Sequence, residues 1–403
     1  MRKHALIIAT LLALTSLVGC DTSKIAPTSK VIEAQEKAAA EAKAAEEAAE
    51  KAAEEEARQE EIAEAIANGE EIPEEEPEEE VQTFRSRISG SEITYNWLDH
   101  RPLAVMLNNI KEGCPQSGIE EASIVYECPV EGRITRLMAI FEKYEEVPKI
   151  GSIRSCRDYF VYLALEYDAI YAHFGQATIY VGDMLNSDAV DNISGAVSGI
   201  EVPAKNAFYR SNDRKAPHNV YIDNEGIVED IKEFGYRTTF RTGFQDKFVY
   251  CDLDDRVTWD DKPSATVLYP GGKTTDKANG FSKVGARFEY NEADGKYYRY
   301  QYGGEHIDGE TGNQLSYDNV VFQYANGIVR DSKDYLGFGL VGDNVDKVQV
   351  FTNGKMTEGT WKRTEIYEPA KYYDTDGNEI VINPGKTWIC LIWNDYAGDV
   401  VIE

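Results

Sequence analysis

The stretch CPVEGRITR, residues 128–136, constrains the fold most strongly, because it joins two apolar runs with very few residues between them. SIVYE precedes it and LMAIF follows it, and both have the composition of buried strands. A parallel crossover needs a dozen or more residues, so the two runs must form a hairpin or lie close together in a mixed sheet. The same stretch places Glu131, Arg133 and Arg136 around Gly132, which raises the question of what charges do at the end of buried strands.

Further strands and helices flank this hairpin between residues 89 and 240. LAVML (103–107) and DAIYAHFG are typical of buried strands, whereas SCRDYFVYLALEY and the stretch near ATIYVGDMLN have the apolar spacing of helices. Strands and helices alternate in this part, so we expect an α/β-type domain with a mixed sheet over residues 89–240.

The remainder of the chain, residues 241–403, has a different sequence pattern. It consists of short β-rich runs such as KYYRYQY, NVVFQY and TWICLIW, separated by Asp-Gly, Asn-Gly and Pro-Gly pairs. These pairs are typical of hairpins and turns. We therefore predict a mostly β C-terminal domain and an α+β fold class for the chain.

Residues 1–20 have the pattern of a bacterial lipoprotein signal peptide. A basic head, MRKH, is followed by an apolar run that is too short to span a bilayer comfortably, and LVGC closes the segment. Cleavage before Cys20 would leave an N-terminal cysteine for acylation, for example with palmitate. The pattern predicts an extracytoplasmic protein anchored to the outer face of the cell membrane. An uncleaved transmembrane anchor with an ordinary Cys20 is the alternative.

Residues 21–88 are expected to form a spacer. Most of this segment is Ala, Glu and Lys, which are strong helix formers, and its few large apolar residues lie near its ends. It resembles a coiled coil in composition but has no continuous heptad seam, so we expect a solvated helix rather than a partner-binding one. At 1.5 Å per residue, a helix over residues 31–67 would be about 55 Å long. The stretch GEEIPEEEPEEE after it has the composition of a disordered acidic linker.

Charge and motif content narrow the classes of function. Of the net charge of −29, residues 1–30 carry +3 and residues 31–80 carry −16, which leaves −16 for the remainder. A negative net charge repels the phosphate backbone, so we expect no nucleic-acid partner. The sequence has no GxSxG, HExxH or P-loop motif, so we predict no metal site and no cofactor. Besides Cys20 there are five cysteines without CxxC spacing, and their pairing is left open: Cys114, Cys128, Cys156, Cys251 and Cys390.

Polar residues at the ends of the apolar runs are the candidate site. Loops positioned by a rigid sheet commonly build binding sites, and arginines near a helix start can hold an anion. We expect one partly accessible ligand site made of Glu131, Arg136, Arg154, Arg157, His173, Arg214, His218 and Asn219. A structural network, in which Glu127 and Glu131 simply pair with these arginines, is the competing interpretation.

Several runs in this order resemble a known bacterial family. RPLAVMLNN, PQSGIEEASIVYECPVEGRITRLMAIF, GSIRSCRDYFVYLALEYDAIYAHFG and RKAPHNVY are similar to the YerB-type lipoproteins, as are NVVFQY, GTWKR and INPGKTWICL in the C-terminal part. The resemblance implies a surface lipoprotein with a two-part extracellular body, and it implies no reaction. Arg133 stands where the family pattern leads us to expect a glycine.

Three functions remain open from the sequence. The favoured one is a membrane-anchored protein that binds an anionic or glycan ligand of the cell envelope, such as a wall polymer, or an envelope protein. In that case Arg136, Arg154, Arg157 and Arg214 would hold the anion, and the Tyr-rich strand KYYRYQY would offer aromatic faces. The second is an envelope enzyme for glycan or phosphoester chemistry, with Glu127 or Glu131 as acid or base and His173 or His218 as its partner. The third is a structural scaffold.

Overall fold

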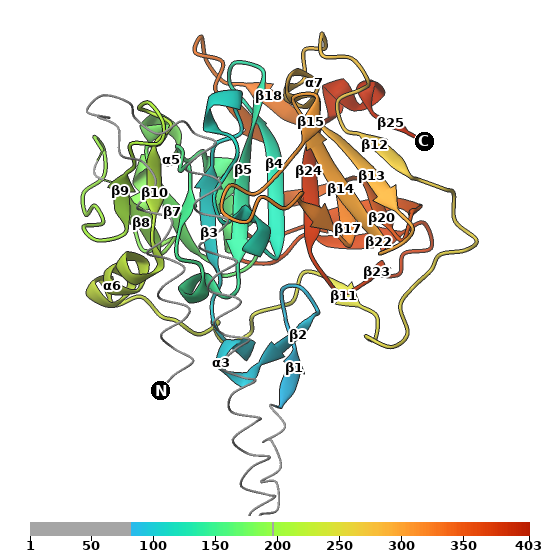
Figure 1. Cartoon of the computed structure of the whole chain (residues 1–403), viewed down its shortest axis with the longest axis horizontal. Helices are drawn as coiled ribbons and strands as arrows, with labels where there is room; N and C mark the ends of the chain where they lie inside the picture. The colour runs from blue at the N-terminus through green and yellow to red at the C-terminus, as the bar shows by residue number, and fades with distance from the viewer. Residues whose placement is uncertain (1–81, 196) are drawn as a thin grey trace, which may run out of the picture. The chain divides into compact units, whose positions relative to one another are not determined.

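A ten-stranded mixed sheet runs through the part of the chain that the structure describes (Figure 1). The structure is a computed structural model, and it describes residues 82–195 and 197–403. In spatial order the strands are β22 (Lys371–Asp374), β21 (Lys355–Arg363), β20 (Gly342–Thr352), β17 (Asn319–Ala325), β24 (Thr387–Trp393), β4 (Ile124–Val130), β5 (Ile134–Phe141), β3 (Leu103–Leu107), β7 (Ile170–His173) and β8 (Asn192–Ser194).

The predicted hairpin lies at the centre of this sheet. Strands β4 and β5 pair in antiparallel fashion from Ile124 opposite Ile140 to Val130 opposite Ile134. Only residues 131–133 are left for the turn, so the short connection expected from the sequence is confirmed. Strand β3 pairs with the other edge of β5, and the sheet is therefore mixed.

Most strands around the hairpin point in one direction. β17, β24 and β4 are mutually parallel, as are β3, β7 and β8, and both groups run opposite to β5. Their carboxyl ends consequently meet at one edge of the sheet. This is the edge at which parallel sheets usually bind ligands.

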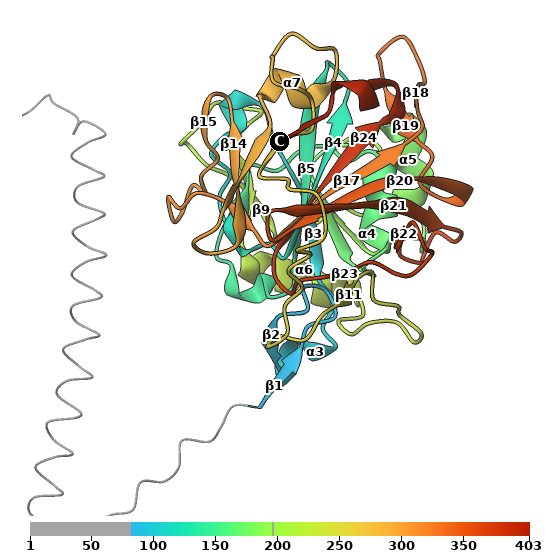
Figure 2. The same ribbon diagram turned by 90° about the vertical axis from the view of Figure 1, so that its right-hand side faces the viewer.

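Both faces of the sheet are covered, which explains why its strands are continuous apolar runs. Met106 and Met138 face the core under α4 (Asp158–Leu165) and α5 (Thr178–Leu185). Leu107 and Leu137 face a second core under α6 (Asn224–Phe234) and a smaller sheet. Figure 2 shows α4 and α5 on one side of the large sheet and β14 and β15 on the other.

The smaller sheet comes from the β-rich C-terminal part. Its strands follow the order β15 (Gly304–Glu305), β14 (Lys296–Gln301), β13 (Arg287–Asn291), β12 (Val267–Tyr269) and β25 (Val401–Ile402), and β16 (Ser316–Tyr317) also pairs with β14. The other elements are β1 (Thr83–Arg85), β2 (Glu92–Thr94), α3 (Tyr95–Leu98), η1 (Lys111–Gly113), η2 (Ile119–Glu121), η3 (Tyr144–Glu146), β6 (Ile150–Gly151), β9 (Phe208–Arg210), β10 (Val220–Ile222), β11 (Val249–Tyr250), α7 (Gly280–Val284), β18 (Gly327–Val329), β19 (Leu336–Phe338), β23 (Val381–Ile382) and η4 (Asn394–Asp399).

The expected α+β character is present, with helices and a mixed sheet in the first part and mostly strands in the second. The boundary expected near residue 240 passes through one continuous sheet, because five strands from each side of it belong to the ten-stranded sheet. The described residues from 82 onward accordingly form one compact unit. The signal peptide, Cys20 and the helical spacer over residues 31–67 lie outside the described residues.

Candidate functional site

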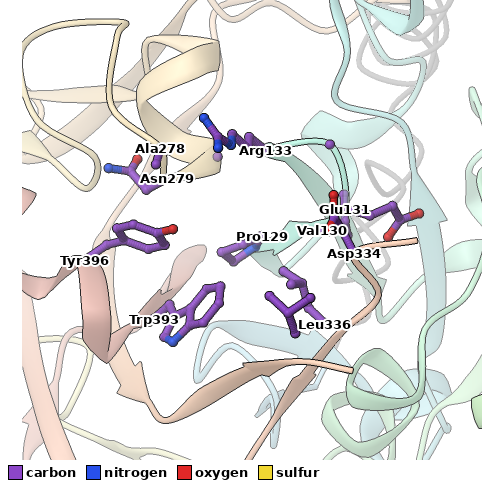
Figure 3. Close-up of a pocket in the computed structure, with 13 residues that line it drawn as sticks. Pro129, Val130, Glu131, Arg133, Ala278, Asn279, Asp334, Leu336, Trp393 and Tyr396 are labelled. Atoms are coloured by element: carbon purple, nitrogen blue, oxygen red, sulfur yellow. The ribbon is translucent and has the colours of Figure 1, made fainter. Parts of the chain in front are cut away.

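A pocket of about 190 Å³ lies beside the β4–β5 turn, and we call it the turn pocket (Figure 3). Its walls come from the carboxyl ends of the parallel neighbours β4 and β24, the turn itself, the start of α7, the β18–β19 hairpin and η4. It is lined by Pro129, Val130, Glu131, Gly132, Arg133, Ala278, Asn279, Gly280, Val329, Asp334, Leu336, Trp393 and Tyr396.

The turn has an unusual backbone. Gly132 has a φ of 77° and Arg133 a φ of 55°, so two consecutive residues are left-handed. Glycine adopts this conformation without steric cost, whereas an arginine is strained in it. The Arg133 side chain is exposed at the rim of the turn pocket, and the sequence resemblance leads us to expect a glycine at this position.

Three arginines gather next to the turn around a single carboxylate. Both Nε and Nη2 of Arg157 donate hydrogen bonds to the carboxylate of Glu131, with a distance of 3.1 Å from Nε to Oε2. Arg136 on β5 donates from Nη1 to the carbonyl of Ser155 over 2.7 Å, which places it beside Arg154 and Arg157. We call Arg136, Arg154 and Arg157 the arginine cluster.

The pKa values in the arginine cluster indicate an excess of positive charge. Burial and the nearby charge of Arg157 lower the pKa of Arg136 to about 10. Burial and Arg157 also lower the pKa of Arg154. Burial alone would raise the pKa of Glu131, but the hydrogen bond and the charge of Arg157, together with the charge of Arg136, outweigh burial and lower the pKa. One carboxylate therefore faces three guanidinium groups.

Arg154 is the accessible member of the arginine cluster. Arg136 and Arg157 are buried, whereas Arg154 is half-buried, and its Nε has no hydrogen-bond partner among the described residues although that atom is inaccessible to solvent. Its backbone is fixed, because its N–H donates to the carbonyl of Met106 at the end of β3 over 2.9 Å. The sheet therefore positions a guanidinium group that forms no ion pair with any residue the structure describes.

His218 and Arg214 lie within the electrostatic reach of the arginine cluster. Burial and the charge of Arg154 lower the pKa of His218, and Arg214 lowers it further. Nδ1 of His218 lies 2.9 Å from Nδ2 of Asn108. Arg214 donates to the carbonyl of Pro115 over 2.6 Å. The lowered pKa leaves the His218 ring neutral at neutral pH, so only Arg214 adds a positive charge here, and its Nε also lies 3.6 Å from Oδ2 of Asp213.

Two of the predicted site residues have structural contacts. His173 is fully buried, with Nδ1 2.9 Å from the carbonyl of Gly175 and Nε2 2.7 Å from Oγ of Ser194. Burial lowers the pKa of His173 to about 4, so its ring is neutral at physiological pH. Asn219 accepts from Nη1 of Arg210 over 2.8 Å and donates to the carbonyl of Ser211 over 2.8 Å, which fixes the β9–β10 connection.

Glu127 is also fully enclosed. Its Oε2 accepts from Nη2 of Arg299 over 2.8 Å and from Nε1 of Trp388 over 3.2 Å. Its Oε1 accepts from Thr135 over 2.8 Å and from Asn109 over 3.3 Å. Glu127 is fully buried and accepts from four donors, and its ion pair with Arg299 joins the two sheets. Its role is therefore structural.

The predicted residues thus divide into a group that is brought together and a group that is not. Glu131 and the arginine cluster meet at the β4–β5 turn, and His218 and Arg214 lie nearby. Within residues 82–195 and 197–403, no hydrogen bond joins Glu127 or Glu131 to His173 or His218, so the pairs required for the enzyme interpretation are not formed.

Sequence reasoning missed the aromatic side of the turn pocket. Trp393 ends β24 and Tyr396 lies on η4, with ring centroids 5.3 Å apart and planes at 84°. TWICLIW was recognised only as a strand, and nothing in the sequence distinguishes its last tryptophan from a core residue. The strand KYYRYQY buries Tyr297, Arg299 and Gln301 against the large sheet and leaves Tyr298 and Tyr300 half-buried on its other face.

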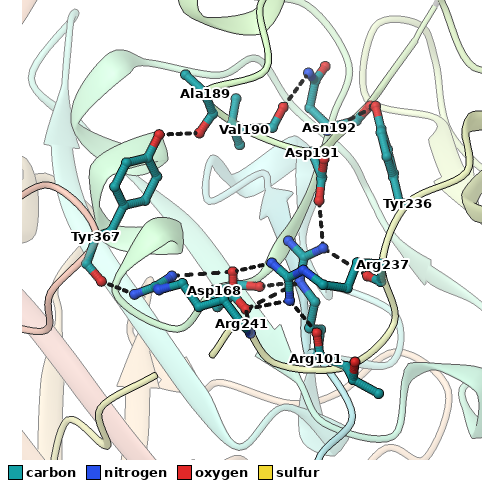
Figure 4. Close-up of polar contacts among 11 residues, drawn as sticks. Arg101, Asp168, Ala189, Val190, Asp191, Asn192, Tyr236, Arg237, Arg241 and Tyr367 are labelled. Atoms are coloured by element: carbon teal, nitrogen blue, oxygen red, sulfur yellow. Dashed lines mark hydrogen bonds and ion pairs between the residues drawn. The ribbon is translucent and has the colours of Figure 1, made fainter. Parts of the chain in front are cut away.

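A second group of arginines surrounds Asp168 (Figure 4). Arg237 donates to both carboxylate oxygens of Asp168 over 2.7 and 2.9 Å, and Arg241 donates through its backbone N–H over 2.7 Å. Arg101 joins Asp168 to Asp191. These contacts tie the segment near residue 240 to the start of β3, which is a structural role. The described residues contain no group of three or more His, Cys, Asp or Glu side chains that could hold a metal ion.

Comparisons with known proteins match the chain in two parts, one on each side of residue 240. The model described as "Protein of unknown function (DUF3048) N-terminal domain" matches residues 88–237, and that of the DUF3048 C-terminal domain matches residues 277–389. The chain therefore belongs to the DUF3048 family, whose function is unknown.

Individual relatives agree with the family assignment. The chain is 28% identical over 313 residues to the Bacillus subtilis (strain 168) protein named "Putative lipoprotein YerB", which covers 76% of this chain and 86% of that protein. The crystal structure of the YerB protein from Bacillus subtilis matches with a TM-score of 0.66 and 25% identity, over 79% of this chain and 99% of that one. The resemblance to the YerB-type family is confirmed. Across the described part of the chain, we find no helix of sufficient length and hydrophobicity to span a bilayer.

Proposed function

We propose that this chain is a lipid-anchored, extracytoplasmic protein that binds an anionic polymer of the cell envelope at the arginine cluster. The anchor is supported by LVGC, with Cys20 as the acylated residue, and by the name of the Bacillus subtilis relative. An acyl chain on Cys20 would hold the body at the outer face of the membrane, where wall polymers are within reach.

The observation that carries the proposal is the unneutralised charge of Arg154. Arg157 already forms an ion pair with Glu131, and Arg136 donates to a backbone carbonyl, so neither needs a ligand. Arg154 has neither type of partner within residues 82–195 and 197–403, and the two buried arginines beside it add to its field. A phosphate or carboxylate at Arg154 would relieve the repulsion among the three guanidinium groups.

The negative charge on the rest of the chain should confine an anionic polymer to the arginine cluster. The charge of −16 that remains after residue 80 repels polyanions from most of the surface. Binding would therefore concentrate where the guanidinium groups of Arg154 and Arg214 supply positive charge. Salt should weaken it, because the Debye length falls from about 10 Å at 0.1 M to about 3 Å at 1 M.

Titration of the full-length chain in detergent with poly(glycerol phosphate) tests the proposal. We expect binding at low salt that weakens at high salt, and a loss of at least tenfold in affinity for Arg154→Ala and for His218→Ala. Lys347→Ala is the control, because it also removes one positive charge but lies on β20, paired with Glu358. Absence of binding by the wild type, or equal losses in Arg154→Ala and Lys347→Ala, would contradict the proposal.

A further inference from the structure

The turn pocket contains polar side chains that have no partner in the part of the chain that the structure describes. Asp334 and Arg133 are exposed, and Tyr396 is half-buried. Within the described residues, no hydrogen bond or ion pair is formed by the side chains of these three residues. Asn279, in contrast, is saturated, since it accepts from the N–H of Ser282 over 2.8 Å and donates to Asp399 over 2.8 Å. The pocket thus offers the guanidinium donors of Arg133, the carboxylate acceptors of Asp334 and a phenolic hydroxyl that can do either.

Its aromatic wall is held in place. A Cβ atom on Gly327 would lie 2.9 Å from Cε2 and from Nε1 of Trp393, so only glycine allows β18 to pack against the indole. Phe338 contacts the indole from another side, with centroids 6.1 Å apart and planes at 86°. Figure 3 shows Trp393, Tyr396, Pro129 and Leu336 arranged around the same space. The wall is therefore formed before any ligand arrives, which lowers the entropic cost of binding.

From this combination we infer that the turn pocket binds a single neutral sugar ring of a wall glycan. A sugar ring has apolar faces that pack on aromatic and proline side chains, and hydroxyl groups around its rim that require both donors and acceptors. The volume of about 190 Å³ is below the roughly 300–1,000 Å³ of pockets for drug-sized ligands, which matches the scale of a single sugar ring. The pocket also lies at the carboxyl ends of parallel strands, where sheets of this kind bind ligands.

Glu131 connects the turn pocket with the arginine cluster. It lines the pocket and is paired with Arg157 at the same time. A glycan whose ring occupies the pocket would thus extend past Glu131 towards the arginine cluster. This step deepens the proposed function and rests on it only for the claim that one polymer occupies both places.

Titration of the full-length chain with the neutral tetrasaccharide of N-acetylglucosamine tests the pocket alone. We expect saturable binding that is at least tenfold weaker in Trp393→Ala and in Tyr396→Ala, and unchanged within twofold in Arg154→Ala. Trp97→Ala is the matched control, because Trp97 is also half-buried but lies on α3. Two pocket variants are used so that unfolding of one does not decide the outcome.

The outcomes separate this inference from the proposed function. Loss of poly(glycerol phosphate) binding in Arg154→Ala without any binding of the tetrasaccharide by the wild type would overturn the sugar pocket and leave the anion site standing. Equal tetrasaccharide affinities in the wild type and both pocket variants would also overturn it. Tighter binding of N-acetyltyrosinamide than of the tetrasaccharide would assign the pocket to a peptide ring instead.

Discussion

The guanidinium group of Arg299 and the carboxylate of Glu127 form an ion pair of 2.8 Å with both side chains fully excluded from solvent. Glu127 lies on β4 of the large sheet and Arg299 on β14 of the small one, so this pair joins the two sheets. Removing one partner leaves a buried charge without compensation, which typically costs about 3 to 5 kcal/mol. We therefore expect Glu127→Gln and Arg299→Met each to lower the free energy of unfolding by that amount, measured by urea denaturation.

An exposed pair provides the control for this prediction. Lys347 and Glu358 are 3.0 Å apart with about half of each side chain exposed, so Lys347→Met should cost less than about 1 kcal/mol. The variant that combines Glu127→Gln with Arg299→Met should cost less than the sum of the two single changes, because the residues are in direct contact. Additive costs would show that the two side chains do not depend on each other.

Burial of His173 predicts a specific dependence of stability on pH. Its pKa is about 4 in the folded chain and 6.5 in its unperturbed state. Between these values the unfolded chain binds more protons, so stability falls as the pH decreases from 6.5 to 4 and this contribution is constant below 4. The loss is on the order of 3 kcal/mol, since one pKa unit corresponds to 1.36 kcal/mol. His306, whose pKa is also lowered by burial, contributes with the same sign.

Thermal denaturation between pH 4 and pH 7 checks this prediction. The wild type should lose stability more steeply with decreasing pH than His173→Gln, which has no titrating group at that position. Parallel curves for the two proteins would mean that His173 is hydrated in the folded chain.

The hairpin could be predicted because its connection is local, whereas the pairing of β24 with β4 could not. These two strands are neighbours in the sheet, yet Thr387 pairs with Ile124 across more than half of the chain. Short loops limit the possible arrangements of adjacent strands, but no comparable limit acts on strands that are distant in sequence. The expectation of separate N-terminal and C-terminal parts therefore reflected a change in sequence pattern. The large sheet contains strands from both parts.

Charged residues within buried strands were recognised as unusual, but their partners could not be assigned. Glu127 and Arg136 interrupt apolar runs in similar ways, and the structure gives them different surroundings. The partner of Glu127 is Arg299, which the alternating burial of KYYRYQY places on the inner face of β14. Alternation indicates which face is buried, but it does not indicate which strand lies opposite. The ligand-binding role of the arginine cluster stays a prediction.

Strain at Arg133 can be tested by exchange with glycine. Relief of the left-handed conformation is worth about 1 to 2 kcal/mol, and the greater freedom of glycine in the unfolded chain offsets about 0.5 to 1 kcal/mol of it. Arg133→Gly should therefore leave the melting temperature unchanged or raise it. Gly132→Ala should lower it, although a Cβ there would meet no atom within 4 Å, because Gly132 has a φ of 77°. A lower melting temperature for Arg133→Gly would indicate that the arginine forms a stabilising contact.

Lipid anchoring predicts a change in processing on substitution of Cys20. Because the thiol is the site of acylation, Cys20→Ala should release the protein from the membrane or leave the precursor uncleaved. Metabolic labelling with a palmitate analogue, followed by membrane fractionation, measures both. A lipid-labelled, normally processed Cys20→Ala protein in the membrane fraction would exclude Cys20 as the anchor.

Removal of the Arg157 side chain should lower stability, whereas removal of the Arg154 side chain should not, although both belong to the arginine cluster. Arg157→Ala leaves the largely buried carboxylate of Glu131 unpaired and also removes a 2.6 Å hydrogen bond to the carbonyl of Cys156, so we expect a loss of about 2 kcal/mol or more in stability. Arg154→Ala removes no such contact and reduces the repulsion on Arg136, so stability should stay within about 0.5 kcal/mol of the wild type. Urea denaturation of the two variants, together with poly(glycerol phosphate) titration, separates structure from binding. If Arg154→Ala unfolds as readily as Arg157→Ala, all three arginines are structural and the proposed anion site does not exist.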